Sequence, residues 1–169
     1  MNYSQLRKFD ISNGPFVRYT MFVSGCHFNC RNCFNKEYKY FKHGNLYTKE
    51  TEDEILSYMR SDNIKGFSLL GGEPFEQLKN GYELDRLVER IKKETNKDTW
   101  VWTGYTWEEI IKNDRFLEFV QKIDTLVDGP FIESKKNIKL KFRGSSNQRI
   151  INVQESLKVG KIIERIELY

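Results

Sequence analysis

The sequence of 169 residues contains no alanine, and it has only three prolines, three cysteines and two histidines. No run of consecutive hydrophobic residues is longer than three. A membrane-spanning helix needs about 20 apolar residues, and the core of a secretory signal needs roughly 7 to 15. The sequence therefore predicts a cytoplasmic protein that makes no membrane contact. The absence of alanine indicates a bias in base composition and predicts nothing about mechanism.

Hydrophobic residues make up 38% of the chain and aromatic residues 14%, which is enough to fill a compact core. The 28 Lys and Arg nearly balance the 24 Asp and Glu, so the net charge is +4 and disorder is not expected. No internal repeat, low-complexity tract or Pro/Gly/Ser-rich linker divides the sequence. We therefore expect a single domain over residues 1–169.

One segment, residues 135–149, is basic and contains no acidic residue. It is too short and isolated to resemble the basic stripe of a nucleic-acid-binding protein, so no nucleic acid partner is predicted. The segment is either a solvated surface or a contact for an anionic partner or cofactor. Its cations are Lys135, Lys136, Lys139, Lys141, Arg143 and Arg149.

Hydrophobic periodicity predicts strands that alternate with helices. The expected strands are 16–23, 67–70, 100–103 and 124–128, and the expected helices are 51–60, 84–91, 106–109 and 116–123. Thr51 with Glu54 is a possible capping box for the first of these helices. Such alternation is typical of an α/β fold with a mostly parallel sheet, in which ligands bind beyond the carboxyl ends of the strands. A closed eight-fold barrel typically needs about 250 residues, so a barrel-like arrangement here has to be partial and open.

All three cysteines lie within eight residues, as Cys26, Cys30 and Cys33 in a C-x3-C-x2-C spacing. An odd number of cysteines without a secretion signal argues against disulfides and favours a shared metal site. Three thiolates can hold three irons of a [4Fe-4S] cluster and leave the fourth open to another ligand. Zinc is the alternative, with His27 or His43 completing a Cys3His set.

A second motif, Gly71-Gly72-Glu73-Pro74, follows the strand expected at 67–70. Glycines at a strand end allow the backbone to approach a ligand closely, and Glu73 offers an acceptor nearby. Pro74 fixes φ and ends the strand pairing. Alone this motif is typical of an ordinary turn, but it lies in the β/α unit that follows the cysteine loop.

Together, the two motifs resemble those of the radical S-adenosylmethionine enzymes. Further blocks resemble one family among them, the activating proteins of anaerobic ribonucleoside-triphosphate reductases. These blocks are Tyr3 and residues 10–11, 13–15, 22–26, 100–105, 126–129 and 143–148.

The resemblance implies an open, partial (β/α) barrel of the radical S-adenosylmethionine type, with one [4Fe-4S] cluster per chain on Cys26, Cys30 and Cys33. It also implies that S-adenosylmethionine is cleaved reductively and that a glycyl radical forms on the large subunit of the reductase. An external electron donor such as a flavodoxin is implied, because the sequence has no second cysteine cluster. The alternatives are an activase of another glycyl-radical enzyme, of the formate-lyase type, and a zinc-binding adaptor.

The expected cofactor-binding residues are Asn32, Cys33 and Phe34 around the third cysteine, together with Gly71, Gly72 and Glu73. His27 is either a hydrogen-bond donor near the cluster or a solvent-facing loop residue. Thr103, Tyr105 and Asp128 follow expected strands, where they would either contact ligand or support the core. Residues Arg143 to Arg149 would contact either the partner or the cofactor carboxylate.

Overall fold

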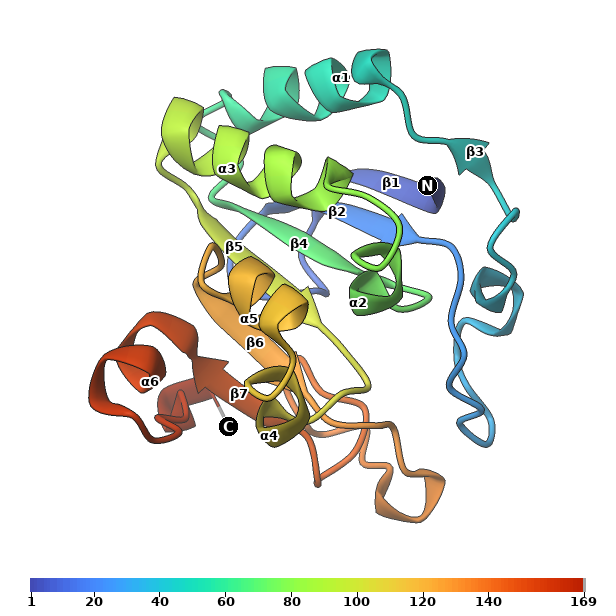
Figure 1. Cartoon of the computed structure of the whole chain (residues 1–169), viewed down its shortest axis with the longest axis vertical. Helices are drawn as coiled ribbons and strands as arrows, with labels where there is room; N and C mark the ends of the chain where they lie inside the picture. The colour runs from blue at the N-terminus through green and yellow to red at the C-terminus, as the bar shows by residue number, and fades with distance from the viewer. Residues whose placement is uncertain (169) are drawn as a thin grey trace.

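In the computed structural model, which describes residues 1–168, the chain forms one seven-stranded sheet in the order β3-β1-β2-β4-β5-β6-β7 (Figure 1). The central strands β2, β4, β5 and β6 are parallel, whereas β1, β3 and β7 pair antiparallel at the two sides. The strands are β1 Asn2–Asp10, β2 Arg18–Val23, β3 Asn45–Leu46, β4 Gly66–Gly71, β5 Asp98–Trp102, β6 Thr125–Asp128 and β7 Arg149–Asn152.

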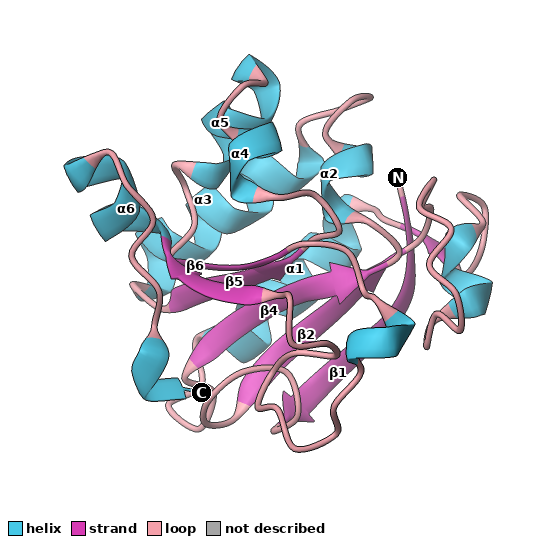
Figure 2. Ribbon diagram, turned by 90° about the horizontal axis from the view of Figure 1, so that it is seen from below, coloured by secondary structure: helices cyan, strands magenta, loops and turns pink. Residues whose placement is uncertain are grey.

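Helices α1 to α5 lie in the connections between the parallel strands, and α6 follows β7. Helices α2, α3, α4 and α5 lie on one face of the sheet, while loops and short helical turns cover the other face (Figure 2). They are α1 Lys49–Met59, α2 Pro74–Gln77, α3 Glu83–Thr95, α4 Trp107–Ile110, α5 Asp114–Val120 and α6 Val153–Val159. Short 3-10 turns are η1 Lys36–Lys39, η2 Glu133–Lys135 and η3 Ile166–Leu168. Within residues 1–168, every helix is too short or too polar to cross a bilayer.

Alternation along the strands divides the core between the two faces of the sheet. Tyr19, Met21 and Val23 of β2 belong to the large hydrophobic core that includes the buried faces of the helices. A smaller cluster lies on the opposite face and is built from Trp100, Val127 and Ile150, with Trp102 and Phe142 packed against it. We call this second surface the inner face.

The expected alternation of strands and helices is confirmed, with the ends of elements displaced by a few residues. The mixed α/β class and the parallel centre of the sheet are also as expected. The sequence reasoning did not identify the outer strands β1, β3 and β7. The capping box expected at Thr51 and Glu54 is wrong, because helix α1 begins at Lys49 and its cap is formed by Thr48 and Thr51.

The short helix expected at 106–109 is confirmed as α4, and a capping box of Thr106 and Glu109 begins it, with Glu109 Oε2 accepting from the Thr106 N–H at 2.7 Å. It fixes the start of α4 immediately after the carboxyl end of β5. The short loop between them, residues 103–106, is therefore held in a definite conformation beside the site described below.

Arg18 joins the amino ends of three parallel strands from a fully buried position on β2. Its guanidinium donates to Ser68 Oγ at 2.7 Å and the Phe67 carbonyl at 2.8 Å on β4, and to Asp98 Oδ2 at 3.2 Å on β5. Burial lowers the pKa of Arg18, and the Asp98 carboxylate opposes that shift. A charge this deeply buried needs its partner, because the penalty for desolvating it is otherwise uncompensated.

We expect Asp98→Ala to lower the free energy of unfolding by roughly 2–3 kcal/mol, because the buried charge of Arg18 loses its partner. This loss is smaller than that for a fully buried ion pair, since the Asp98 side chain is 36% exposed. The double variant Arg18→Met/Asp98→Ala should recover part of that loss, since no unpaired charge remains. Urea unfolding measures both. Glu89→Gln, which removes one exposed partner of Lys122 and leaves Asp85 and Glu118 in place, should change stability little. Additive losses in the double variant would contradict the coupling.

Candidate functional site

A cavity of about 520 Å³ opens at the carboxyl ends of the parallel strands. Leu70 and Trp102 from the inner face of β4 and β5 form part of its lining. Further lining comes from the loop after β2, from the residues that follow β4 and β5, and from the segment between β6 and β7. The lining includes Cys26, Cys30, Asn32, Cys33, Phe34, Gly71, Gly72, Glu73, Thr103 and Gly104. The structure therefore brings the predicted cluster ligands and the predicted cofactor-binding residues around one space.

The loop after β2, which carries the cysteines, is closed by backbone hydrogen bonds at its base. The Gly25 N–H donates to the Tyr38 carbonyl at 2.7 Å, and the Cys26 N–H donates to the Lys39 carbonyl at 3.1 Å. Gly25 has a φ of +98°, and a Cβ there would lie 2.3 Å from the Phe41 ring. These contacts fix the cysteine loop without using the thiols.

The three cysteines are unbridged and partly buried. Burial, with a smaller contribution from the nearby Glu73 carboxylate, raises the pKa of Cys26 to about 12, and burial also raises the pKa of Cys30. In residues 1–168, no three His, Cys, Asp or Glu side chains are placed to hold a single metal ion. A cubic cluster does not require that convergence, because each thiolate binds a different iron atom.

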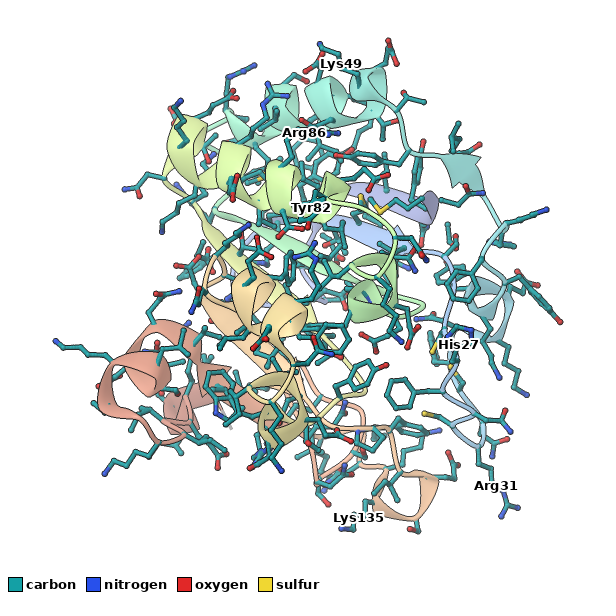
Figure 3. The ribbon with its side chains drawn as sticks, viewed as in Figure 1. His27, Arg31, Lys49, Tyr82, Arg86 and Lys135 are labelled. Carbon is teal, nitrogen blue, oxygen red and sulfur yellow. The ribbon has the colours of Figure 1, made fainter. Side chains whose placement is uncertain are left out.

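Both histidines are bonded elsewhere and neither lines the cavity. His27 Nδ1 lies 2.8 Å from Glu76 Oε2, and its side chain is 72% exposed on the cysteine loop (Figure 3). His43 Nδ1 lies 3.1 Å from Ser4 Oγ. The Cys3His zinc site considered above therefore lacks its histidine in this arrangement.

Gly71 and Gly72 allow the end of β4 to pack directly on β2 and the cysteine loop. Gly71 has a φ of +116°, and a Cβ there would lie 2.7 Å from the backbone of Val23. A Cβ on Gly72 would lie 2.6 Å from the Gly25 carbonyl oxygen and 2.7 Å from that of Tyr38. The absence of side chains is thus required by chain-to-chain contact, independently of any ligand.

Glu73 lines the cavity, but its carboxylate is engaged within the fold. It accepts from Thr103 Oγ1 at 2.7 Å, from the Gly104 N–H at 2.8 Å and from the Phe75 N–H at 3.0 Å. The last bond caps α2. Burial raises the pKa of Glu73 to about 7, because these hydrogen bonds offset only part of the desolvation of the charged form. The expected acceptor is present, with most of its hydrogen-bonding capacity already used.

The two residues that flank Cys33 differ in their surroundings, although both line the cavity. Asn32 has a φ of +54°, a conformation that asparagine tolerates better than most residues, so it serves the turn between Cys30 and Cys33. The Phe34 side chain is 99% exposed. Because Phe34 lines the cavity and is also exposed to solvent, it lies at the mouth of the cavity.

The weaker candidates separate into two groups. Thr103 lines the cavity and donates to Glu73, whereas Tyr105 and Asp128 are absent from the lining. Tyr105 donates to Glu76 at 2.5 Å, and Asp128 accepts from the Trp107 N–H at 2.7 Å and from Arg149. Tyr105 and Asp128 therefore support the fold and do not line the cavity.

The segment Arg143 to Arg149 is divided in the same way. Arg143, Gly144 and Gln148 line the cavity, while Arg149 forms ion pairs with Asp128 and Glu108. Gln148 Oε1 accepts from the Gly144 N–H at 2.8 Å, and Gln148 Nε2 donates to the Gly129 carbonyl at 3.1 Å. Gln148 thus holds this wall of the cavity together.

The sequence reasoning missed five residues in or beside the site. Leu70, Trp102 and Phe131 line the cavity, and Phe28 packs edge-on to Tyr105 with ring centroids 4.9 Å apart. Alternation in Trp100–Trp102 places both tryptophans on one face, which was a signal for Trp102. No sequence signal pointed to Glu76, because its partners His27 and Tyr105 are distant in sequence.

Comparison with known proteins agrees with this arrangement. A family model described as a 4Fe-4S single cluster domain matches residues 12–151. A protein of Vibrio cholerae, named anaerobic ribonucleoside-triphosphate reductase-activating protein, is 42% identical over 153 residues, which cover 89% of this chain and 97% of the relative.

Proteins of the same name from other sources are also similar. The Escherichia coli K12 protein is 43% identical over 151 residues, covering 88% of this chain and 96% of the relative. The protein of Enterobacteria phage T4 is 36% identical over 151 residues, covering 89% and 93%. With such similarity over nearly the full length of both sequences, the chain belongs to the family of anaerobic ribonucleoside-triphosphate reductase-activating proteins.

Proposed function

We propose that this chain, as a single radical S-adenosylmethionine domain over residues 1–169, generates a glycyl radical on the large subunit of an anaerobic ribonucleoside-triphosphate reductase. The observation that carries the proposal is that the three cysteines and the Gly71–Glu73 turn line one cavity at the carboxyl ends of parallel strands. The curved inner face beside that cavity is compatible with an open, partial (β/α) barrel.

The donor set fits a [4Fe-4S] cluster. Cys26, Cys30 and Cys33 are unbridged, they line the same cavity, and neither histidine is available there as a fourth protein ligand. Because burial raises the pKa of Cys26 and Cys30, binding to iron has to release protons from these thiols. Three protein ligands leave one position for a small molecule.

The rest of the cavity fits S-adenosylmethionine as the second group. Its volume of about 520 Å³ is within the range of small-molecule sites, and its lining combines aromatic side chains with backbone groups of Gly71 and Gly72. Held by these residues, the two groups would supply a 5'-deoxyadenosyl radical. One electron from an external donor, such as a flavodoxin, would cleave S-adenosylmethionine into methionine and this radical, and a hydrogen atom taken from a glycine Cα would convert the radical to 5'-deoxyadenosine.

The chain itself positions the three cysteine ligands and excludes water from the cavity. The closed cysteine loop fixes three ligands, and the Glu73 hydrogen bonds keep the ends of β4 and β5 beside them. Leu70, Trp102 and Phe131 give the cavity apolar surface, which limits side reactions of a radical with solvent. The mouth stays open, so the substrate itself has to cover it, and a glycine in a flexible loop of a second protein meets that need.

We expect anaerobically reconstituted protein to contain about four irons and four sulfides per chain and no stoichiometric zinc. We expect each single cysteine variant to remain folded, because backbone hydrogen bonds hold the loop, but to lose all cleavage of S-adenosylmethionine. These variants are Cys26→Ala, Cys30→Ala and Cys33→Ala. Metal analysis, circular dichroism and product chromatography measure these outcomes. His27→Ala and His43→Ala are the matched controls and should keep their iron. Stoichiometric zinc that depends on either histidine would establish the zinc-binding adaptor instead.

Gly72→Ala should reduce iron content and cleavage of S-adenosylmethionine at least tenfold, because the added Cβ would meet the backbone of the cysteine loop. Gly72→Val should be more severe. Gly160→Ala is the control, since Gly160 has a φ of +70° but nothing lies within 4 Å of its Cβ position. That variant should lose roughly 1 kcal/mol of stability and keep its iron. Normal iron content in Gly72→Ala would show that the glycine serves only a turn.

Mixing the chain with the reductase, S-adenosylmethionine and a reductant should give a doublet in the electron paramagnetic resonance spectrum. The doublet should be absent when the reductase's radical-bearing glycine is replaced by alanine, because no hydrogen atom of that glycine is then available. A doublet only with a formate-lyase type partner would favour that alternative. Cleavage of S-adenosylmethionine without a radical on either partner would refute the activase assignment.

A further inference from the structure

Two large apolar side chains from different segments of the chain are exposed and also line the cavity. Phe34 of the cysteine loop is 99% exposed, and Ile138 of the segment between β6 and β7 is 91% exposed, yet both line the cavity. Single exposed hydrophobic residues are common, whereas exposed apolar side chains at a cavity with polar residues around them are a feature of surfaces that bind a partner.

Around Ile138 the surface carries four exposed lysines, Lys135, Lys136, Lys139 and Lys141. Within residues 1–168, none of them takes part in an ion pair, and the same is true of Arg31 on the cysteine loop. Figure 3 shows Arg31 and Lys135 at the same end of the molecule, with their side chains pointing away from the ribbon. By contrast, Arg149 at the end of the same basic run is paired with Asp128 and Glu108.

The lysine side chains are not needed to hold their own segment in place. The Lys135 N–H donates to the Ile132 carbonyl at 2.9 Å, the Ser146 N–H to the Lys135 carbonyl at 2.9 Å, and the Asn137 N–H to the Gly144 carbonyl at 3.3 Å. Backbone bonds therefore fix the segment and leave its positive charges available to another molecule.

We propose that this rim, formed by Phe34, Lys135, Lys136, Ile138, Lys139 and Lys141, docks an acidic segment of the substrate protein beside the glycine that enters the cavity. The inference rests on the proposed function. Because Phe34, Lys136 and Ile138 belong to the cavity lining, a molecule that contacts them covers the mouth. The substrate glycine has to pass through that mouth, whereas an electron donor needs only to approach the cluster.

The test compares two variants that each remove three positive charges. The rim variant is Lys135→Gln/Lys139→Gln/Lys141→Gln, and the control is Lys93→Gln/Lys158→Gln/Lys161→Gln, whose lysines are exposed and distant in sequence from the cavity segments. Reconstituted proteins are assayed for reductase binding at several salt concentrations and, separately, for cleavage of S-adenosylmethionine without the reductase. Ile138→Ser and Ile166→Ser, both at exposed positions, test the apolar contact in the same way.

We expect the rim variant to bind the reductase about tenfold more weakly at low salt, mainly through slower association, and with a smaller dependence on salt. The control should bind within about threefold of the parent protein, and both variants should cleave S-adenosylmethionine normally. Ile138→Ser, unlike Ile166→Ser, should also weaken binding to the reductase.

Equal losses in the rim and control variants would overturn the proposal, because the effect would then come from net charge. Normal reductase binding with slower reduction by an acidic electron donor would assign the surface to that donor and would also overturn it. Failure of the parent protein to cleave S-adenosylmethionine or to activate the reductase would refute the proposed function itself, and the docking proposal with it.

Discussion

The buried residue Glu73 connects the carboxyl ends of three parallel strands, and the geometry of the cavity depends on that connection. Its backbone N–H donates to the Gly25 carbonyl at 2.8 Å on the loop after β2. Its carboxylate accepts hydrogen bonds from Thr103 and Gly104, which follow the end of β5. Burying a carboxylate is costly unless its oxygens are hydrogen-bonded, and here three donors meet it. Glu73, together with the packing of Gly72 on Gly25, therefore sets the position of the cysteine loop relative to β4 and β5.

The two ends of the inner face have different roles. At the amino ends, Arg18, Ser68 and Trp100 are fully buried and fill the space between β2, β4 and β5. At the carboxyl ends, Leu70 and Trp102 border a cavity. Stability and ligand binding are thus separated along the same strands, because the interactions that hold the strands together lie at the opposite end from the site.

Local patterns in the sequence were sufficient to predict the cysteine loop, the glycine turn and the alternation of strands with helices along the chain, since each depends on residues close together in the chain. The strands β1 and β7 were missed because their antiparallel pairing with β2 and β6 is set by register with other segments, not by their own alternation. The orientation of the Glu73 carboxylate was also unpredictable, because its donors Thr103 and Gly104 lie about thirty residues away. Phe34 was expected as a cofactor contact, and only its exposure places it at the mouth.

The filling of the inner face by Arg18 and Trp100 has a consequence for the order of events at the site. The buried side chains of the amino half close the cavity on that side, so it opens away from them, where Phe34 and Ile138 are exposed. A protein seated over the mouth would retain the small molecules beneath it. Under the proposed function, small ligands would therefore load before the substrate protein docks, and products would be exchanged for fresh ligand only after that protein dissociates.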